Sequence, residues 1–150
     1  MIEITGNLWD YWQKPDMIVC ITTNGVVTTS TVDDRVVRSL VMGRGNAAEA
    51  KQRIPALPHI LGNHVNHYGN VPAFISSYRI CSFPAKEDWR AKSSLPLIEK
   101  SAEELLHLTE IYPRYVWVLP RPGCGYGGLK WEKVKPVIDF LPENVWVISE

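Results

Sequence analysis

Runs of strand-forming residues alternate with longer helical patterns along the 150 residues of this chain, and few folds accommodate that alternation. Strands that are separated by helices of crossover length pair in parallel, and the helices then cover both faces of the sheet. We therefore predict an α/β fold with a largely parallel sheet. The expected strands, rich in Val, Ile, Tyr, Phe and Trp, are Ile2–Thr5, Met17–Thr22, Ala73–Ser82, Tyr115–Leu119 and Val145–Ile148.

Three helices are expected between these strands. Asn46 should cap the first, with Glu49 in the position of a capping-box carboxylate, and this helix should end before Pro55. The second should begin near residues 93–94, with Pro96 in its first turn, and the third near Leu129. Apolar residues recur at helical spacing in both: Ile98, Ala102, Leu105 and Leu106 in the second, and Val134, Val137, Ile138 and Leu141 in the third.

Two further segments are less regular. Residues 26–40 contain a Thr/Ser run followed by Asp33-Asp34, and we predict a surface hairpin or loop there. Residues 55–72 contain several prolines and glycines, and we expect a short helix between two turns.

Length and charge limit the partners of the chain. Its 150 residues suit one domain over residues 1–150. Lys plus Arg and Asp plus Glu are equal at 16 each, so no net positive field draws the chain to nucleic acid or to an anionic membrane. The apolar runs are too short to span a bilayer, and the first residues have a strand pattern rather than that of a targeting segment. We expect a monomer without membrane association or stable nucleic-acid binding.

The cysteines and histidines argue against a disulfide framework and against a metal site. Three cysteines at wide spacing favour a reducing compartment, the cytoplasm: Cys20, Cys81 and Cys124. The histidines have no Cys or carboxylate at ligand spacing, so we predict that all four lie at the surface: His59, His64, His67 and His107. Neither a metal nor a cofactor is expected.

Two glycine clusters each stand between a strand and a helix. One is Gly43-Arg44-Gly45-Asn46, and the other is Gly123-Cys124-Gly125-Tyr126-Gly127-Gly128. Glycine lets backbone N–H groups approach an anion closely, and a helix N-terminus adds a favourable partial charge. A tight turn explains a single Gly-x-Gly, whereas two such clusters suit a diphosphate.

Three familiar phosphate-binding signatures do not account for these clusters. The chain has no G-x-x-x-x-G-K-[ST] motif. Residues 43–48 fit G-x-G-x-x-A, but no acidic residue follows about 20 positions later to hold a ribose. A cysteine-phosphatase loop needs an arginine where Lys130 stands, so we interpret Cys124 as a small residue that fills a tight loop.

Four motifs together resemble the macrodomain family over nearly the whole chain. In chain order they are Gly6-Asn7-Leu8, Met17–Gly25, Val41–Ala47 and Pro120–Trp131. Within that family the chain is most similar to the terminal ADP-ribose glycohydrolases and to the macrodomain antitoxins that remove ADP-ribose from DNA, because residues 83–90 resemble the antitoxins' Pro-Thr-Lys segment. The resemblance implies a three-layer α/β/α sandwich with a mixed sheet and a cleft at the strand ends.

The resemblance also implies the ligand, which is ADP-ribose or an ADP-ribosylated macromolecule. Asn7 would lie near the adenine, where the family usually has an aspartate; asparagine still accepts a hydrogen bond, but without charge assistance. Asn24 would face the distal ribose, and Arg44 can either join it or face solvent. The remaining ligand-binding residues implied in this way are Gly43, Gly45 and Asn46 at the distal ribose and diphosphate, and Gly123, Cys124, Gly125, Tyr126 and Gly127 at the phosphates.

Lys86 decides between binding and catalysis. In the related hydrolases a lysine at this place attacks the anomeric carbon of the distal ribose as a free amine. Residue chemistry alone favours a solvated loop lysine beside Glu87 and Asp88, whereas the resemblance favours the nucleophile. Gly127 stands where the terminal glycohydrolases carry an aspartate, so no carboxylate can assist from that position.

We therefore expect a hydrolase that cleaves ADP-ribosyl linkages on protein or DNA through Lys86. Two alternatives stay open. A module that sequesters ADP-ribose or a related NAD-derived nucleotide would need the same loops but not the lysine. A phosphatase of ADP-ribose 1″-phosphate would use the same pocket, without an evident phosphatase nucleophile. Trp89 and Arg90 either contact a substrate beyond the ADP-ribose or pack their loop onto the following helix.

Overall fold

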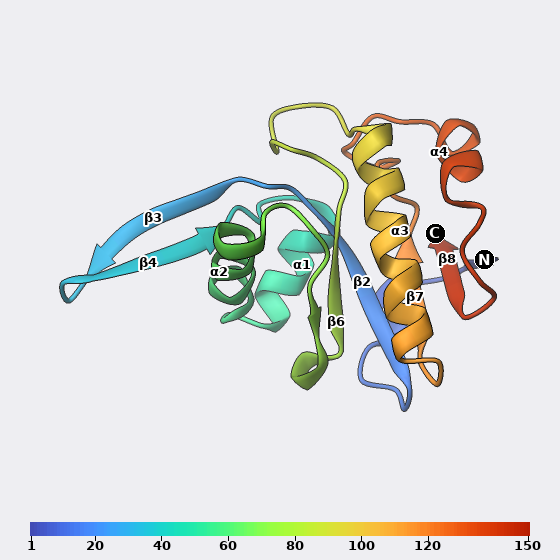
Figure 1. Cartoon of the computed structure of the whole chain (residues 1–150), viewed down its shortest axis with the longest axis horizontal. Helices are drawn as coiled ribbons and strands as arrows, with labels where there is room; N and C mark the ends of the chain where they lie inside the picture. The colour runs from blue at the N-terminus through green and yellow to red at the C-terminus, as the bar shows by residue number, and fades with distance from the viewer.

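The main sheet of the computed structural model, which describes residues 1–150, has six strands in the order β1-β8-β7-β2-β6-β5 (Figure 1). All neighbouring strands are parallel except β5, which is antiparallel to β6. The predicted α/β fold with a mixed, largely parallel sheet is confirmed. The six strands are β1 (Ile2–Thr5), β2 (Met17–Thr23), β5 (Phe74–Ile75), β6 (Ile80–Pro84), β7 (Val116–Pro120) and β8 (Val145–Ser149).

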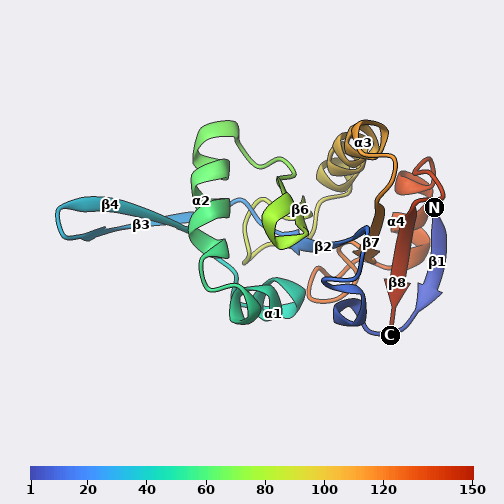
Figure 2. The same cartoon turned by 90° about the horizontal axis from the view of Figure 1, so that it is seen from below.

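Helices cover both faces of this sheet, and this confirms the predicted three layers (Figure 2). Successive side chains of a strand point to opposite faces, and the central strand β2 is apolar on both. Ile18 and Cys20 contribute to one core, and Val19 and Ile21 to the other. The first core is covered by α3 (Leu95–Ile111) and α4 (Trp131–Ile138), and the second by α1 (Gly45–Arg53), α2 (Leu57–Tyr68) and the 3-10 helix η1 (Leu8–Tyr11).

The helix signals of the sequence differ in their outcome. α3 begins at Leu95, close to the start that we predicted near residues 93–94, and the Ser94 hydroxyl caps it by accepting a hydrogen bond from the backbone N–H of Leu97 at 3.3 Å. The irregular segment 55–72 contains the 12-residue helix α2. None of the helices has the length and apolar composition that a bilayer crossing requires.

Residues 26–40 form a hairpin, which is one of the two alternatives that we predicted for this segment. Its strands β3 (Val27–Val32) and β4 (Arg35–Leu40) pair with each other alone and project from the body of the molecule (Figures 1 and 2). The base of the hairpin is held by α2. Gly62 of α2 lies so close to β4 that a Cβ atom there would be 2.9 Å from the backbone nitrogen of Leu40.

The prediction of one strand over Ala73–Ser82 is wrong. The segment is itself a tight hairpin, in which β5 turns through the 3-10 helix η2 (Ser76–Tyr78) and Arg79 into β6. Arg79 has a left-handed φ of 54°, and Phe74 then pairs with Cys81 across the hairpin. Strand-forming residues on both sides of a short turn read as one run because the turn itself lacks Gly and Pro.

Three smaller predictions also need correction. Asn46 does not cap α1, because the cap position is occupied by Arg44 without a side-chain bond, and Asn46 lies inside the helix. α4 begins at Trp131 rather than near Leu129, and Leu141 is buried beyond the end of that helix. His64 is half-buried, and this burial lowers its pKa, whereas the other three histidines are exposed.

Candidate functional site

A cleft of about 780 Å³ opens where the parallel strands end. Its walls include residues that follow or end β1, β2, β6, β7 and β8, and the N-terminus of α1 adds one rim. In open α/β sheets the carboxyl ends of the strands are the usual place for a ligand, since loops from several strands converge there. All twelve residues that the sequence pointed to as binding or catalytic line this one cleft: Asn7, Asn24, Gly43, Arg44, Gly45, Asn46, Lys86, Gly123, Cys124, Gly125, Tyr126 and Gly127.

The two glycine clusters belong to different segments of the chain, and both line the cleft and offer free hydrogen-bond donors. The backbone N–H groups of residues 43–47, at the start of α1, have no main-chain acceptor. The same holds for the N–H groups of residues 125–127, in the loop after β7. Unpaired donors at a helix N-terminus and in a glycine loop form a setting that favours an anion.

Left-handed backbone conformations shape both clusters. Gly45 has a φ of +59° and Gly123 a φ of +74°, which are conformations that glycine adopts without strain. The loop after β7 is closed by hydrogen bonds from the N–H of Leu129 to the carbonyl of Gly123, at 2.9 Å, and from the N–H of Ser93 to the carbonyl of Gly127, at 3.0 Å. A rigid loop of this kind keeps its free donors oriented.

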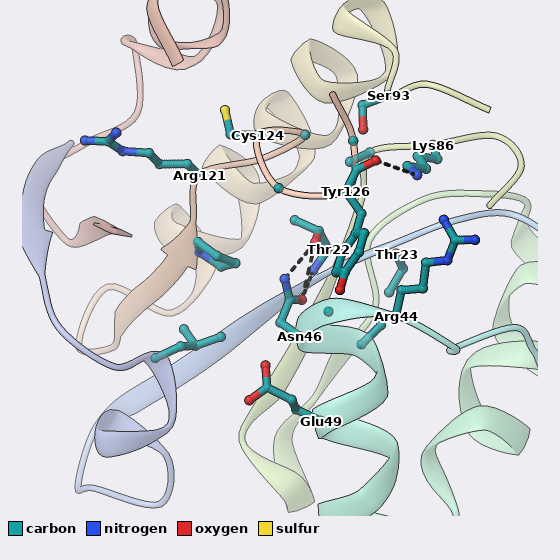
Figure 3. Close-up of a pocket in the computed structure, with 18 of the residues that line it drawn as sticks. Thr22, Thr23, Arg44, Asn46, Glu49, Lys86, Ser93, Arg121, Cys124 and Tyr126 are labelled. Atoms are coloured by element: carbon teal, nitrogen blue, oxygen red, sulfur yellow. Dashed lines mark hydrogen bonds between the residues drawn. The ribbon is translucent and has the colours of Figure 1, made fainter. Parts of the chain in front are cut away.

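Two asparagines that line the cleft use their side chains for hydrogen bonds to other residues of the chain. The carboxamide of Asn46 contacts Thr22: its oxygen accepts from the backbone N–H at 2.7 Å, and its nitrogen donates to the hydroxyl at 2.9 Å (Figure 3). The Asn24 side chain donates to the carbonyl of Val41 at 2.8 Å and accepts from the N–H of Val26 at 2.9 Å. Asn24 is buried and holds the two ends of the β3–β4 hairpin together.

Asn7 has its side-chain oxygen engaged as well. It precedes η1, and its oxygen accepts a hydrogen bond from the backbone N–H of Trp9 at 2.9 Å, as a helix cap does. The amide nitrogen makes no hydrogen bond to protein, and Asn7 lines the cleft.

Lys86 lies at the mouth of the cleft, two residues after the end of β6. Its backbone N–H donates to the carbonyl of Thr23 at 3.3 Å, and its own carbonyl accepts from the side chain of Asn70 at 3.0 Å. The ammonium group donates to the carbonyls of Tyr126, at 3.3 Å, and Trp89, at 3.4 Å (Figure 3). Long bonds to two loop carbonyls hold the amine above the cleft and leave it accessible.

An aromatic and cationic cluster completes the mouth. The guanidinium of Arg44 lies 5.7 Å from the ring centroid of Trp89 and 5.9 Å from that of Tyr126. The Tyr126 ring itself packs over Gly45, where a Cβ atom would be 3.5 Å from the ring. These contacts join three loops that are distant in sequence, and Arg44 faces these rings at the mouth.

The remaining polar groups of the loops differ in their exposure. Cys124 is half-buried, its Sγ contacts the carbonyl of Pro122 at 3.5 Å, and burial raises the pKa of the thiol. Asp88 binds Arg90 through two side-chain bonds of 2.6 Å and 2.9 Å, and these bonds hold the pKa of the Asp88 carboxyl down at about 2. Neither group has the properties of an activated nucleophile.

Several residues of the cleft were not expected from the sequence. Ser93 is 8% exposed, and its hydroxyl, which has no hydrogen-bond partner, lies beneath the loop at Gly127. Glu49 projects from α1 into the cleft and does not reach back to the helix start. Further lining residues of this kind include Leu8 and Trp9 from η1, Thr22 and Thr23 from β2, and Ile148 from β8. In the sequence these residues look like parts of a helix start, a helix interior or a strand end, and nothing local marks them as site residues. Only the packing of the layers brings their side chains together in the cleft.

Comparisons with known proteins relate the chain to one group of solved structures. The macrodomain of DarG from Thermus aquaticus is 25% identical, with a TM-score of 0.71 over 99% of this chain and 97% of that one. The macrodomain of DarG from Mycobacterium tuberculosis is 22% identical, with a TM-score of 0.70 over 98% of this chain and 95% of that one.

A third structure of the same group contains a ligand. DarTG from Thermosipho africanus, solved in complex with ADP-ribose, is 17% identical, with a TM-score of 0.72 over 98% of this chain. The chain spans 41% of the length of that protein. No family model matches the sequence, and no curated protein matches it.

Proposed function

Because the chain is a macrodomain, we propose that its cleft binds ADP-ribose and that Lys86 gives it ADP-ribosyl hydrolase activity. The observation that carries the binding proposal is the pair of free N–H clusters at residues 43–47 and 125–127, which line one cleft. A diphosphate is the part of ADP-ribose that needs such donors. The similarity in fold to a protein solved with ADP-ribose supports the same ligand.

The dimensions and lining of the cleft support a dinucleotide-sized ligand. A volume of about 780 Å³ falls within the range of small-molecule sites. The distal ribose would lie toward Asn24 and the mouth, and the diphosphate between the two glycine clusters. The base would lie beside Asn7 and η1.

The proposal of catalysis rests on the position of Lys86. Its amine lies at the mouth, where a group attached to the distal ribose would leave the cleft. As a free amine it would attack the anomeric carbon, and the bond between that carbon and the attached group would break with its electron pair on the leaving group. Water would then release the ribose from the lysine. The attached group is protein or DNA.

Calorimetric titration with ADP-ribose tests the binding proposal. We expect one site per chain in the wild type and no detectable heat for Gly125→Glu, which would place bulk and negative charge against the phosphates. Gly125 is a suitable position because no atom lies within 4 Å of a Cβ there, so the fold should tolerate the change. Ser30→Glu, on the exposed β3 strand, adds the same charge far from the cleft and should bind as the wild type does.

A wild type that shows neither heat nor a thermal shift with millimolar ADP-ribose would contradict the binding proposal. Equal loss of binding in both variants would assign the effect to net charge rather than to the phosphate loop.

A further inference from the structure

One buried hydroxyl of the cleft has no hydrogen-bond partner in the protein. Three serines of the chain are buried, and two of them are paired. The Ser82 hydroxyl accepts from the backbone N–H of Ala73 at 2.9 Å, and the Ser101 hydroxyl donates to the carbonyl of Pro84 at 2.7 Å. The third is Ser93, which is 8% exposed and whose hydroxyl bonds to no other group of the protein. A buried hydroxyl without a partner lowers the stability of the free protein, so a partner from outside the protein is expected.

Backbone hydrogen bonds fix the position of this hydroxyl. The N–H of Ser93 donates to the carbonyl of Gly127 at 3.0 Å, and the N–H of Ser94 donates to the carbonyl of Ala85 at 2.9 Å. These bonds tie the start of α3 to the loop after β7 and to the residue that follows β6. Ser93 lines the cleft at this junction, and its hydroxyl points toward the loop after β7 (Figure 3).

The absence of a side chain at Gly127 leaves room for the hydroxyl. A Cβ atom at position 127 would lie 2.2 Å from the Ser93 oxygen, so the hydroxyl occupies the space that a side chain there would need. It therefore lies against residues 125–127, whose N–H groups are free. The peptide between Tyr126 and Gly127 takes no part in the two backbone hydrogen bonds that close the loop. Because glycine changes its dihedral angles at low cost, this peptide can turn and uncover the hydroxyl while both bonds remain.

The other free groups beside this hydroxyl are hydrogen-bond donors. The N–H groups of residues 125–127 have no main-chain acceptor, and the ammonium group of Lys86 lies 3.3 Å from the carbonyl oxygen of Tyr126. Several donors that converge in this way favour an anion, and a serine hydroxyl can add one more donor. A hydrogen bond from a hydroxyl to a charged oxygen is stronger than one between neutral groups. A phosphate of the ligand would therefore supply the partner that Ser93 lacks.

We propose that Ser93 is a ligand-binding residue of the cleft, and that its hydroxyl donates a hydrogen bond to a phosphate oxygen of the bound nucleoside diphosphate. This inference rests on the proposed binding of ADP-ribose and adds a side chain from outside the two glycine clusters. The free protein carries the cost of an unpaired hydroxyl, and the ligand removes that cost when it binds.

Ser93→Ala tests this assignment, because it removes the hydroxyl and little else. We expect the affinity for ADP-ribose, measured by calorimetric titration, to fall about tenfold through loss of a hydrogen bond to a charged group. The melting temperature of the free protein should stay the same or rise, because alanine leaves no unpaired group. Ser101→Ala is the matched control, since it removes a buried hydroxyl that has a partner. It should lower the melting temperature and leave the affinity unchanged.

Phosphorus NMR of bound ADP-ribose identifies the part of the ligand that the hydroxyl contacts. A phosphorus signal of the ligand should move in Ser93→Ala and keep its wild-type position in Ser101→Ala. The inference is overturned, while the binding proposal stands, by any of three results for Ser93→Ala: unchanged affinity, a lower melting temperature, or weaker binding with both phosphorus signals unmoved. A wild type that does not bind ADP-ribose overturns the binding proposal and this inference with it.

Discussion

The carboxamide of Asn46 binds the backbone N–H and the side-chain hydroxyl of Thr22, with its oxygen 2.7 Å from the backbone nitrogen and its own nitrogen 2.9 Å from the hydroxyl oxygen. β2 pairs with β7 only as far as Val19, so the strand end at Thr22 has a free N–H on that side. Asn46 closes this gap and ties the start of α1 to the central strand.

Removal of the Asn46 carboxamide should therefore destabilise the fold. We expect Asn46→Ala to lower the free energy of unfolding by about 1–3 kcal/mol, because a partly buried N–H loses its acceptor. Urea unfolding measures this change. Asn66→Ala, at an exposed position of α2, is the control and should be neutral within about 0.5 kcal/mol. Equal stability of the two variants would show that water replaces the carboxamide without cost.

Two neighbouring glycines of the loop after β7 should respond differently to a methyl group. A Cβ at position 127 would lie 2.2 Å from the Ser93 hydroxyl and 2.4 Å from the Gly123 carbonyl oxygen, and the second contact cannot be relieved by a side-chain rotation. We expect Gly127→Ala to cost about 1–3 kcal/mol. Gly125→Ala meets no atom within 4 Å and should be neutral or stabilising by about 0.4–1 kcal/mol, since it restricts the unfolded chain. Thermal unfolding compares them, and a less stable Gly125→Ala would contradict the loop geometry.

The pKa of Asp88 gives a pH-dependent signature of the loop after β6. Hydrogen bonds from Arg90 lower this pKa to about 2, from 3.8 for an unperturbed aspartate. Because the pKa is lower in the folded state than in the unfolded state, the ionised Asp88 carboxylate stabilises the loop at pH values above 3.8. This contribution to stability is lost as the pH falls through about 2. Carboxyl NMR titration should show a low midpoint in the wild type and a return toward 3.8 in Arg90→Gln. Arg38→Gln, on the hairpin, should leave the midpoint low, and an unchanged midpoint in Arg90→Gln would remove Arg90 as the cause.

Lys86→Ala separates binding from turnover. If the amine is the nucleophile, the variant should lose hydrolysis of ADP-ribosylated DNA or protein and keep its affinity for ADP-ribose within a few-fold, because the phosphate donors belong to other segments. The rate at which ADP-ribose is released from the substrate measures hydrolysis, and calorimetric titration of the same preparation measures the affinity for ADP-ribose. Lys51→Ala, on α1, tests whether loss of a lysine has a general effect. Equal rates in wild type and variant, or binding without turnover in both, would favour a module that sequesters the nucleotide.

Local signals in the sequence predicted much of the fold. Alternating apolar runs identified four of the main strands, and the Ser94-Leu95-Pro96 start identified α3, because caps and strand patterns act between residues that are close in sequence. The glycine clusters pointed to the segments that line the cleft for the same reason.

Contacts between distant segments account for the errors. The sequence suggested that Asn46 caps its own helix, but its partner Thr22 lies 24 positions away, and no local pattern reveals that pairing. The places of Ser93 beneath Gly127 and of Glu49 in the cleft likewise depend on how the layers pack. The hairpin within residues 73–82 was missed because Arg79 adopts a left-handed conformation without a glycine.

The β3–β4 hairpin leaves the cleft at Asn24 and returns to it at Val41, and the Asn24 side chain joins these two points at 2.8 Å. A hairpin whose two ends are joined at its base can change in length at its tip without moving the segments that flank it. The exposed turn at Asp33-Asp34 is therefore a suitable place to insert a reporter peptide or to attach a fluorophore, which would leave the cleft available for titration.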